Sequence, residues 1–158
     1  MSSEDGASYP LPPGYEISTD KARIDLDFVH RYLSEESYWS PGISRESVER
    51  ALANSLLNFG VFGPDGKQVG FARVTGDGET FAYIADVFIA TALKGRGLGK
   101  ALMTAVLAHP YLKVRRVLLA TMDAHSLYAK FDFQPMIRPD RFLERLLPGV
   151  REKLAAAP

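Results

Sequence analysis

A glycine-rich stretch between an apolar run and a helix-like run constrains the fold of this chain more than any other feature. Residues 94–100 are Lys-Gly-Arg-Gly-Leu-Gly-Lys, after the apolar run 81–90 and at the start of the helix-like run 98–109. Glycine lets a ligand approach the backbone closely and adopts positive φ. The first turn of a helix has unpaired N–H groups at the positive end of its dipole. The pattern therefore predicts strand, turn and helix, with a site for a phosphorylated ligand at the turn.

The spacing within this glycine loop (residues 94–100) excludes two common nucleotide-binding loops. A dinucleotide fingerprint needs Gly or Ala five positions after its first glycine, where this chain has Lys100. A Walker loop needs a glycine and a hydroxyl residue at the places that Lys94 and Ala101 fill. The loop instead resembles motif A of the GCN5-related N-acetyltransferases (GNAT), Gln/Arg-x-x-Gly-x-Gly/Ala, with lysine in place of Gln/Arg.

A second segment also resembles a GNAT motif. Residues 121–133 are Thr-Met-Asp-Ala-His-Ser-Leu-Tyr-Ala-Lys-Phe-Asp-Phe, similar to the family pattern Ala-x-x-Leu-Tyr-x-x-x-Gly-Phe at the end of a short helix. Asp132 stands where the family usually has glycine, and Thr121 where it often has asparagine. Because aspartate tolerates a left-handed backbone better than most residues, we expect the fold to survive the first change. The two motifs, in this order and separation, support the resemblance strongly.

Composition excludes several other classes of function. The 158 residues carry 19 basic and 19 acidic side chains, so no global field draws the chain to nucleic acid or an anionic membrane. The chain has no cysteine, which excludes disulfides, thiolate metal sites and an acetyl-cysteine intermediate. The histidines lack companions at metal-ligand spacing, so no metal site is expected. A polar, acidic start unlike a signal peptide and the absence of an apolar run of ~18 residues favour a cytoplasmic protein without a membrane span.

The order of apolar and turn-forming segments predicts an α+β (mixed α/β) fold. Strands are expected over 15–24, 58–62, 68–74, 80–89, 114–120 and 135–138, and helices over 26–33, 44–55, 98–109 and 124–131, with a tail helix from 141. The GNAT resemblance implies a twisted, mostly antiparallel sheet of six to seven strands flanked by about four helices. Residues 1–13, which contain three prolines, predict a flexible N-terminal tail before a single domain over 14–158.

The resemblance implies a function: an acetyl-CoA-dependent N-acetyltransferase, with acetyl-CoA as cosubstrate and no metal. Acyl transfer to a primary amine requires a neutral amine, donors for the carbonyl oxygen and a stabilised leaving thiolate. If the amine attacks directly in a ternary complex, no protein nucleophile is needed. A non-catalytic CoA-binding regulatory or interaction module is the alternative.

Three side chains are candidates for the chemistry. Tyr128 lies in the second motif, where the resemblance implies an acid for the CoA sulfur; otherwise it is a core aromatic. Asp86 lies in an otherwise apolar strand, where a charge is costly unless it is used or paired. Burial would raise its pKa and make it a base, but it could equally be the structural partner of an arginine. Tyr83 is the other candidate for accepting the proton, and the sequence leaves the choice between them open.

Binding residues follow from the same resemblance. The backbone of Val87, Phe88 and Ile89 is expected to bind the pantetheine and polarise the acetyl carbonyl. The pyrophosphate is expected on the glycine loop: Lys94, Gly95, Arg96, Gly97, Leu98, Gly99 and Lys100. For the acceptor, Tyr38 and Trp39 lie in a break between two helices, where they could enclose a small-molecule or peptide amine or merely pack on the sheet. Dimers are common among similar proteins, so a homodimer is also considered.

Overall fold

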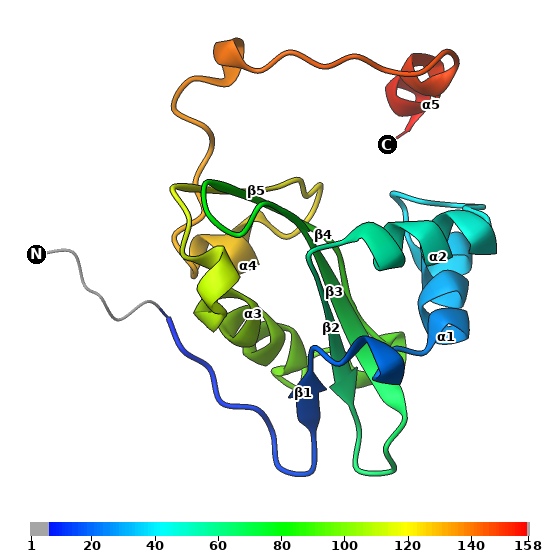
Figure 1. Ribbon diagram of the computed structural model, residues 1–158, viewed down its shortest axis with the longest axis vertical. Coiled ribbons are helices and arrows are strands. Elements are labelled where there is room, and N and C mark those ends of the chain that lie inside the picture. Colours follow the sequence, from blue (N-terminus) through cyan, green and yellow to red (C-terminus); the bar gives the residue numbers. More distant parts are fainter. Residues whose placement is uncertain (1–6, 158) are drawn as a thin grey trace, which may run out of the picture.

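The computed structural model describes residues 7–157 and shows one mixed sheet between two layers of helices (Figure 1). The strands are β1 (Glu16–Ser18), β2 (Leu57–Phe62), β3 (Gln68–Gly76), β4 (Phe81–Ile89) and β5 (Arg116–Leu119). The helices are α1 (Leu26–Arg31), α2 (Arg45–Asn54), α3 (Leu98–Ala108), α4 (His125–Ala129) and α5 (Val150–Ala156). Strands β1 to β4 are antiparallel neighbours in chain order, and β5 lies parallel to β4 after the α3 crossover. The predicted α+β fold is confirmed.

The sheet has five strands, so the expectation of six to seven was wrong, and five helices stand in place of about four. The first strand is shorter than 15–24 because the Asp20 side chain accepts the Ala22 N–H and starts a 3₁₀ turn over Lys21–Arg23. The strand expected over 135–138 does not form: proline at 135 cannot donate to a ladder, and Pro139 begins another 3₁₀ turn.

The sheet has a hydrophobic core on each face because successive strand side chains point to opposite sides. On β3, Phe71 packs with residues of α1 and α2, such as Val29 and Val48. Its neighbour Ala72 belongs to the larger core beneath α3 and α4. Figure 1 shows these two pairs of helices on opposite sides of the sheet. Side chains from the helices on either face of the sheet can therefore line an opening between two strands.

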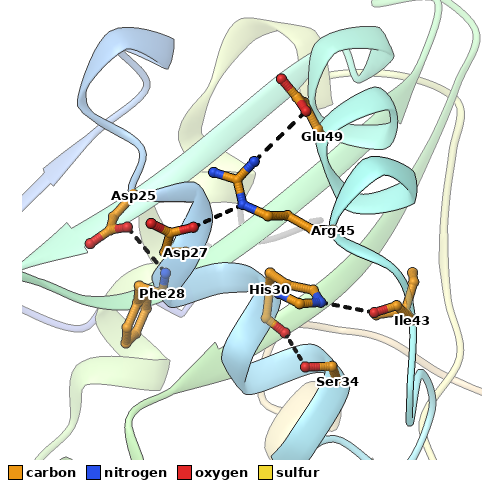
Figure 2. A network of polar contacts seen from close by, with 8 residues as sticks. All are labelled: Asp25, Asp27, Phe28, His30, Ser34, Ile43, Arg45 and Glu49. Atoms are coloured by element: carbon orange, nitrogen blue, oxygen red, sulfur yellow. Dashed lines mark hydrogen bonds and ion pairs between the residues drawn. The ribbon is translucent and has the colours of Figure 1, made fainter.

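A polar network fixes α1 against α2 and the segment between them (Figure 2). Arg45 Nε donates to Asp27 Oδ1 at 2.9 Å, and His30 Nε2 lies 2.9 Å from the carbonyl oxygen of Ile43. A π-helical turn (Tyr32–Glu36) continues α1 and leads into the loop over residues 37–43. This loop contains the two aromatic residues expected to contact an acceptor, so the network sets its position.

The N-terminal segment contacts the body of the protein. The Tyr9 N–H donates to Thr104 Oγ1 at 3.0 Å, and the Tyr9 ring meets Phe131 edge-on at 5.5 Å. Residues 7–11 thus pack beside α3 where a flexible tail was expected, because their apolar side chains join its core. Residues 1–6 of that expected tail lie outside the described residues.

The C-terminal arm, residues 134–157, contacts β5 where the Phe142 ring centre lies 5.0 Å from the Arg116 guanidinium, and its end with α5 extends away from the sheet (Figure 1). Its helix α5 begins at Val150 and not near residue 141 as predicted. Four large apolar side chains of the arm are strongly exposed: Ile137 (95%), Leu143 (97%), Leu147 (77%) and Leu154 (58%). Within residues 7–157, no helix is long and apolar enough to cross a membrane.

Candidate active site

A β-bulge in β4 places Asp86 in an uncommon conformation. Arg73 pairs with Ala85 and Phe71 with Phe88, so two residues of β4, Asp86 and Val87, face one residue of β3. Asp86 has φ 54°, in the left-handed region. A bulge of this kind bends its strand and redirects a side chain. Strained non-glycine residues of this type are frequent at functional sites.

Side-chain contacts hold the bulge in place. Asp86 Oδ2 accepts a hydrogen bond from Arg73 Nε, and Oδ1 accepts one from the Trp39 indole N–H, each at 2.8 Å. The side chains of the Arg73–Asp86 ion pair are only 20% and 10% exposed. Asp86 is thus a structural partner of an arginine in this structure, one of the two roles the sequence left open.

Strands β4 and β5 diverge beside the bulge. Pairing between them covers only Phe81–Ile84 and Arg116–Leu119, so β4 has no strand partner on this side from Ala85 on. The Ala90 N–H donates to the Val69 carbonyl of β3 at 2.7 Å. Since strand amides alternate in direction, the N–H groups of Ile89 and Val87 point away from β3. These are the two amides expected to contact the cosubstrate.

The glycine loop presents unpaired amides at the end of the same strand. Gly95 and Gly97 have φ 82° and 84°, and Gly97 is the N-cap of α3. Within the described chain, no N–H of residues 95–100 donates to a protein acceptor. The side chain of Leu98 is buried, so only its backbone can face a ligand. The loop therefore fits the diphosphate of a nucleotide-like ligand: free donors at a helix N-terminus, with basic side chains beside them.

The basic residues of the loop differ in position. Lys94 lines the cavity described below, and Arg96 is exposed beside it. The Lys100 ammonium lies 5.4 Å from the centre of the Tyr9 ring, a cation–π contact. Of the three, Lys100 is thus already engaged by a neighbouring side chain.

Tyr128 lies in α4 at the other wall of the site. Its side chain is buried, and its hydroxyl hydrogen-bonds to no residue in the range 7–157. Burial raises the pKa of Tyr128 to about 12, with smaller contributions from Tyr38 and Asp123. The phenol therefore keeps its proton at neutral pH.

The helix that carries Tyr128 ends in a Schellman motif. The Phe133 N–H donates to the Tyr128 carbonyl, and the Asp132 N–H to the Ala129 carbonyl, both at 3.2 Å. Asp132 has φ 66°, so the left-handed backbone expected at this position is confirmed. Aspartate thus fills the place usually taken by glycine without loss of the turn.

A cavity of about 610 Å³ joins these features between the diverging strands. The predicted residues that line it are Tyr38, Trp39, Tyr83, Asp86, Val87, Phe88, Ile89, Lys94, Gly99 and Tyr128. Gly95, Arg96, Gly97, Leu98 and Lys100 do not line it and lie at its glycine-loop end. Residues of the α1–α2 segment and of α4 contribute together, so both helical layers form the walls of the cavity.

Tyr38 and Trp39 line the cavity, and polar contacts hold their side chains in place. The Tyr38 hydroxyl accepts a hydrogen bond from the Met122 N–H at 3.0 Å, and the two rings meet edge-on at 5.0 Å. Together with the Trp39–Asp86 bond, these contacts connect the α1–α2 segment to both sides of the gap between the strands. The rings thus form a rigid wall of the cavity.

Sequence reasoning missed several residues of the site. Tyr32 and Glu36, at the ends of the π turn, and Asp123, after β5, line the cavity, and Arg73 supports Asp86. Asp123 lies inside the second motif, so its proximity to Tyr128 could have marked it. Nothing in the local pattern distinguishes Tyr32 from an ordinary core residue.

Comparison with known proteins identifies the class. Residues 57–135, half of the chain, match the sequence profile of the acetyltransferase (GNAT) domain. A Gibberella zeae protein named "putative acetyltransferase" is 31% identical over 138 residues, covering 73% of this chain and 76% of its own length. The fold and site are those of a CoA-dependent acyltransferase scaffold, and the chain belongs to the GNAT acetyltransferase family.

Solved structures agree with this assignment. A Xanthomonas campestris structure described as a "putative acetyltransferase belonging to the GNAT family" is 47% identical, with a TM-score of 0.81, over 86% of this chain and 95% of that one. A Staphylococcus aureus protein described as a "probable acetyltransferase" is 27% identical, with a TM-score of 0.68, over 84% and 98%. The family implies use of acetyl-CoA, which the free amides of the glycine loop fit.

Proposed function

We propose that the protein is an N-acetyltransferase that transfers the acetyl group of acetyl-CoA to a primary amine by direct attack in a ternary complex. The observation that carries the proposal is the cavity, which joins the amides of β4 and of the α3 N-terminus to the hydroxyl of Tyr128. The reaction requires hydrogen-bond donors for the diphosphate, for the carbonyl oxygen and for the leaving sulfur, and the cavity brings such groups together.

The residues of β4 and the glycine loop orient the cosubstrate. The loop amides bind the diphosphate, with Lys94 and Arg96 adding positive charge. The Val87 and Ile89 N–H groups hydrogen-bond the pantetheine and the thioester carbonyl, where they stabilise negative charge as it develops. Acetyl-CoA supplies the activated acyl group.

Tyr128 acts on the leaving sulfur by hydrogen bonding. A thiol has a pKa of about 8.5, whereas that of Tyr128 is about 12. Complete proton transfer to the thiolate would be uphill by roughly 3.5 pKa units, about 5 kcal/mol. Tyr128 therefore donates a hydrogen bond that stabilises the departing thiolate and keeps its own proton, a narrower role than that of an acid.

Tyr83 is the better placed of the two candidate bases. Both carboxylate oxygens of Asp86 accept hydrogen bonds from groups that stay protonated, Arg73 and the Trp39 indole. The Tyr83 side chain is 36% exposed, lines the cavity and can hold a water that removes the amine proton. Asp86 instead positions Trp39 and the β4 amides.

Two measurements test the proposal. If acetyl-CoA binds the folded chain, then at about 100 times its Kd it adds about 2.7 kcal/mol of stability and raises Tm by roughly 5–10 °C; NADH and ATP should raise Tm much less. Thiol release from acetyl-CoA should then depend on added amine.

The same two measurements distinguish an N-acetyltransferase from the rival function, a non-catalytic CoA-binding module. The engagement of both Asp86 oxygens favours the module, because it leaves Asp86 without a free oxygen to accept the proton of an amine. A large rise in Tm without amine-dependent thiol release across a broad panel of amines would establish the module and refute catalysis.

A further inference from the structure

The cavity has opposite charges at its two ends. Lys94 lines the end beside the glycine loop, whereas Glu36 and Asp123 line the wall formed by the π turn and the segment before α4. Neither carboxylate forms an ion pair within residues 7–157. Asp86, in contrast, is neutralised by Arg73. The part of the cavity away from the glycine loop therefore has a net negative charge.

Two buried hydroxyls without partners lie beside these carboxylates. Tyr32 and Tyr128 are 7% and 9% exposed, line the cavity and make no side-chain hydrogen bond to any described residue. Among the described residues, Asn58 Oδ1 is the one fully buried polar side-chain atom without a hydrogen-bond partner. The hydroxyls of Tyr32 and Tyr128 also lack a partner, so they are not fully buried and are accessible from the cavity. Burial raises the pKa of Tyr32, and the nearby negative charges of Glu36 and Asp123 raise it further. Glu36 and Asp123, both exposed to solvent, thus lie near enough to the Tyr32 hydroxyl to act on its charge, and all three residues line the same cavity.

The charge of this part of the cavity defines the acceptor. An amine attacks only when neutral, so the reacting nitrogen cannot neutralise the two carboxylates at the moment of reaction. A monoamine would bind there as an unreactive ammonium ion. An acceptor with a second protonated nitrogen satisfies the carboxylates while the first nitrogen reacts. The acetylated product has one positive charge fewer and so binds more weakly.

We propose that the acceptor is a dicationic amine whose second ammonium group binds between Glu36 and Asp123, with its N–H directed to the Tyr32 hydroxyl. The proposal rests on the proposed function, since it names the substrate class of the same site. Tyr32 stacks on Phe88 with ring centres 3.9 Å apart and planes 3° from parallel, which fixes the hydroxyl. The stack thus holds the Tyr32 ring in place at the proposed ammonium site.

The test compares α,ω-diaminoalkanes with monoalkylamines of the same heavy-atom count as acceptors in the thiol-release assay. We expect kcat/KM to be about tenfold or more higher for the best diamine. Glu36→Gln and Asp123→Asn should each lower the diamine value by about threefold or more and change the monoamine value little. Glu35→Gln, an exposed neighbour that does not line the cavity, is the matched control and should change neither. Added salt should raise KM for the diamine only.

A calorimetric titration of the diamine into the CoA-saturated protein separates the two levels of inference. Equal kcat/KM for matched amines, unaffected by Glu36→Gln and Asp123→Asn, would overturn the dicationic acceptor and leave the N-acetyltransferase intact. Diamine binding that both substitutions weaken, without thiol release from any amine, would support the cation site and refute catalysis. Neither binding nor turnover would overturn both.

Discussion

The Arg73–Asp86 ion pair offers a prediction whose magnitude separates a structural carboxylate from a catalytic base. Asp86→Asn removes the charge, keeps an oxygen for the Trp39 indole and keeps a side chain that tolerates a left-handed backbone. What it breaks is the pair at 2.8 Å between Arg73 Nε and Asp86 Oδ2.

The expected cost follows from the burial of the pair. Removal of one partner from a buried pair costs about 3–5 kcal/mol, whereas an exposed pair contributes about 0–1 kcal/mol. The Arg73 and Asp86 side chains are 20% and 10% exposed. We therefore expect a loss of about 2–3 kcal/mol, and, at about 2–4 °C per kcal/mol, a fall in Tm of roughly 4–12 °C.

Asp27→Asn is a matched control. It breaks the Arg45–Asp27 pair, which has nearly the same length, 2.9 Å, but side chains that are 50% and 79% exposed (Figure 2). It should lower the free energy of unfolding by less than about 1 kcal/mol. Urea unfolding of both variants, with Arg73→Met added to form a double-mutant cycle, measures the coupling directly.

Enzyme activity decides the role of Asp86. If Asp86 only positions its neighbours, kcat at a temperature where the variant is folded should fall by no more than about tenfold, and the pH–rate profile should keep its shape. Loss of a general base typically costs about 10²–10⁴ in rate. A variant with wild-type Tm, a hundredfold slower rate and a missing limb of the profile would refute the structural assignment.

Three further predictions follow. Tyr128→Phe should lower kcat about tenfold to a hundredfold through loss of the hydrogen bond to the thiolate. The pKa of Tyr128 is raised to about 12 in the folded protein, so the protonated phenol favours the folded state fully below pH ~10, and this contribution to the free energy of unfolding is lost as the pH rises towards 12. Urea unfolding should therefore show that the wild type loses about 2 kcal/mol of stability relative to Tyr128→Phe over this range. Gly97→Ala should cost about 1–2 kcal/mol of stability because residue 97 has a positive φ. Gly66→Ala in the β2–β3 turn, where φ is also positive, is the control and should cost a similar amount. Calorimetry should show weaker acetyl-CoA binding for Gly97→Ala alone. Hydrogen bonds from Thr80 lower the pKa of Asp77 far below its usual value. The ionised Asp77 carboxylate therefore stabilises the folded state fully at neutral pH, and this contribution is lost in acid. The difference in Tm between the wild type and Asp77→Asn should narrow below pH ~4.

Local features of the fold could be predicted from the sequence. Glycines at 95 and 97 before an apolar helical run indicated the turn and the start of α3, and both adopt positive φ. The Gly-Pro-Asp-Gly turn at 63–66 indicated the β2–β3 hairpin. In each case a few adjacent residues determine the conformation, so the pattern contains the information.

Features that depend on distant residues could not be predicted. The Asp86–Trp39 bond joins residues 47 positions apart, and no local pattern indicates that partner. The bulge at Asp86 depends on the register with β3, which the apolar run of β4 does not fix. The strand expected over 135–138 was wrong because no strand within residues 7–157 pairs with this segment, where Ile137 is 95% exposed, although the local sequence resembles a strand end.

The divergence of β4 from β5 has an evolutionary consequence. In the function proposed above, acetyl-CoA binds beside α3 and the acceptor contacts the segment between α1 and α2, so different layers hold the two substrates. Substitutions in residues 32–43 can therefore change which amine is admitted while the nucleotide-facing layer keeps its sequence. A scaffold whose cavity walls come from two separate layers can acquire a new acceptor through mutation of one short segment.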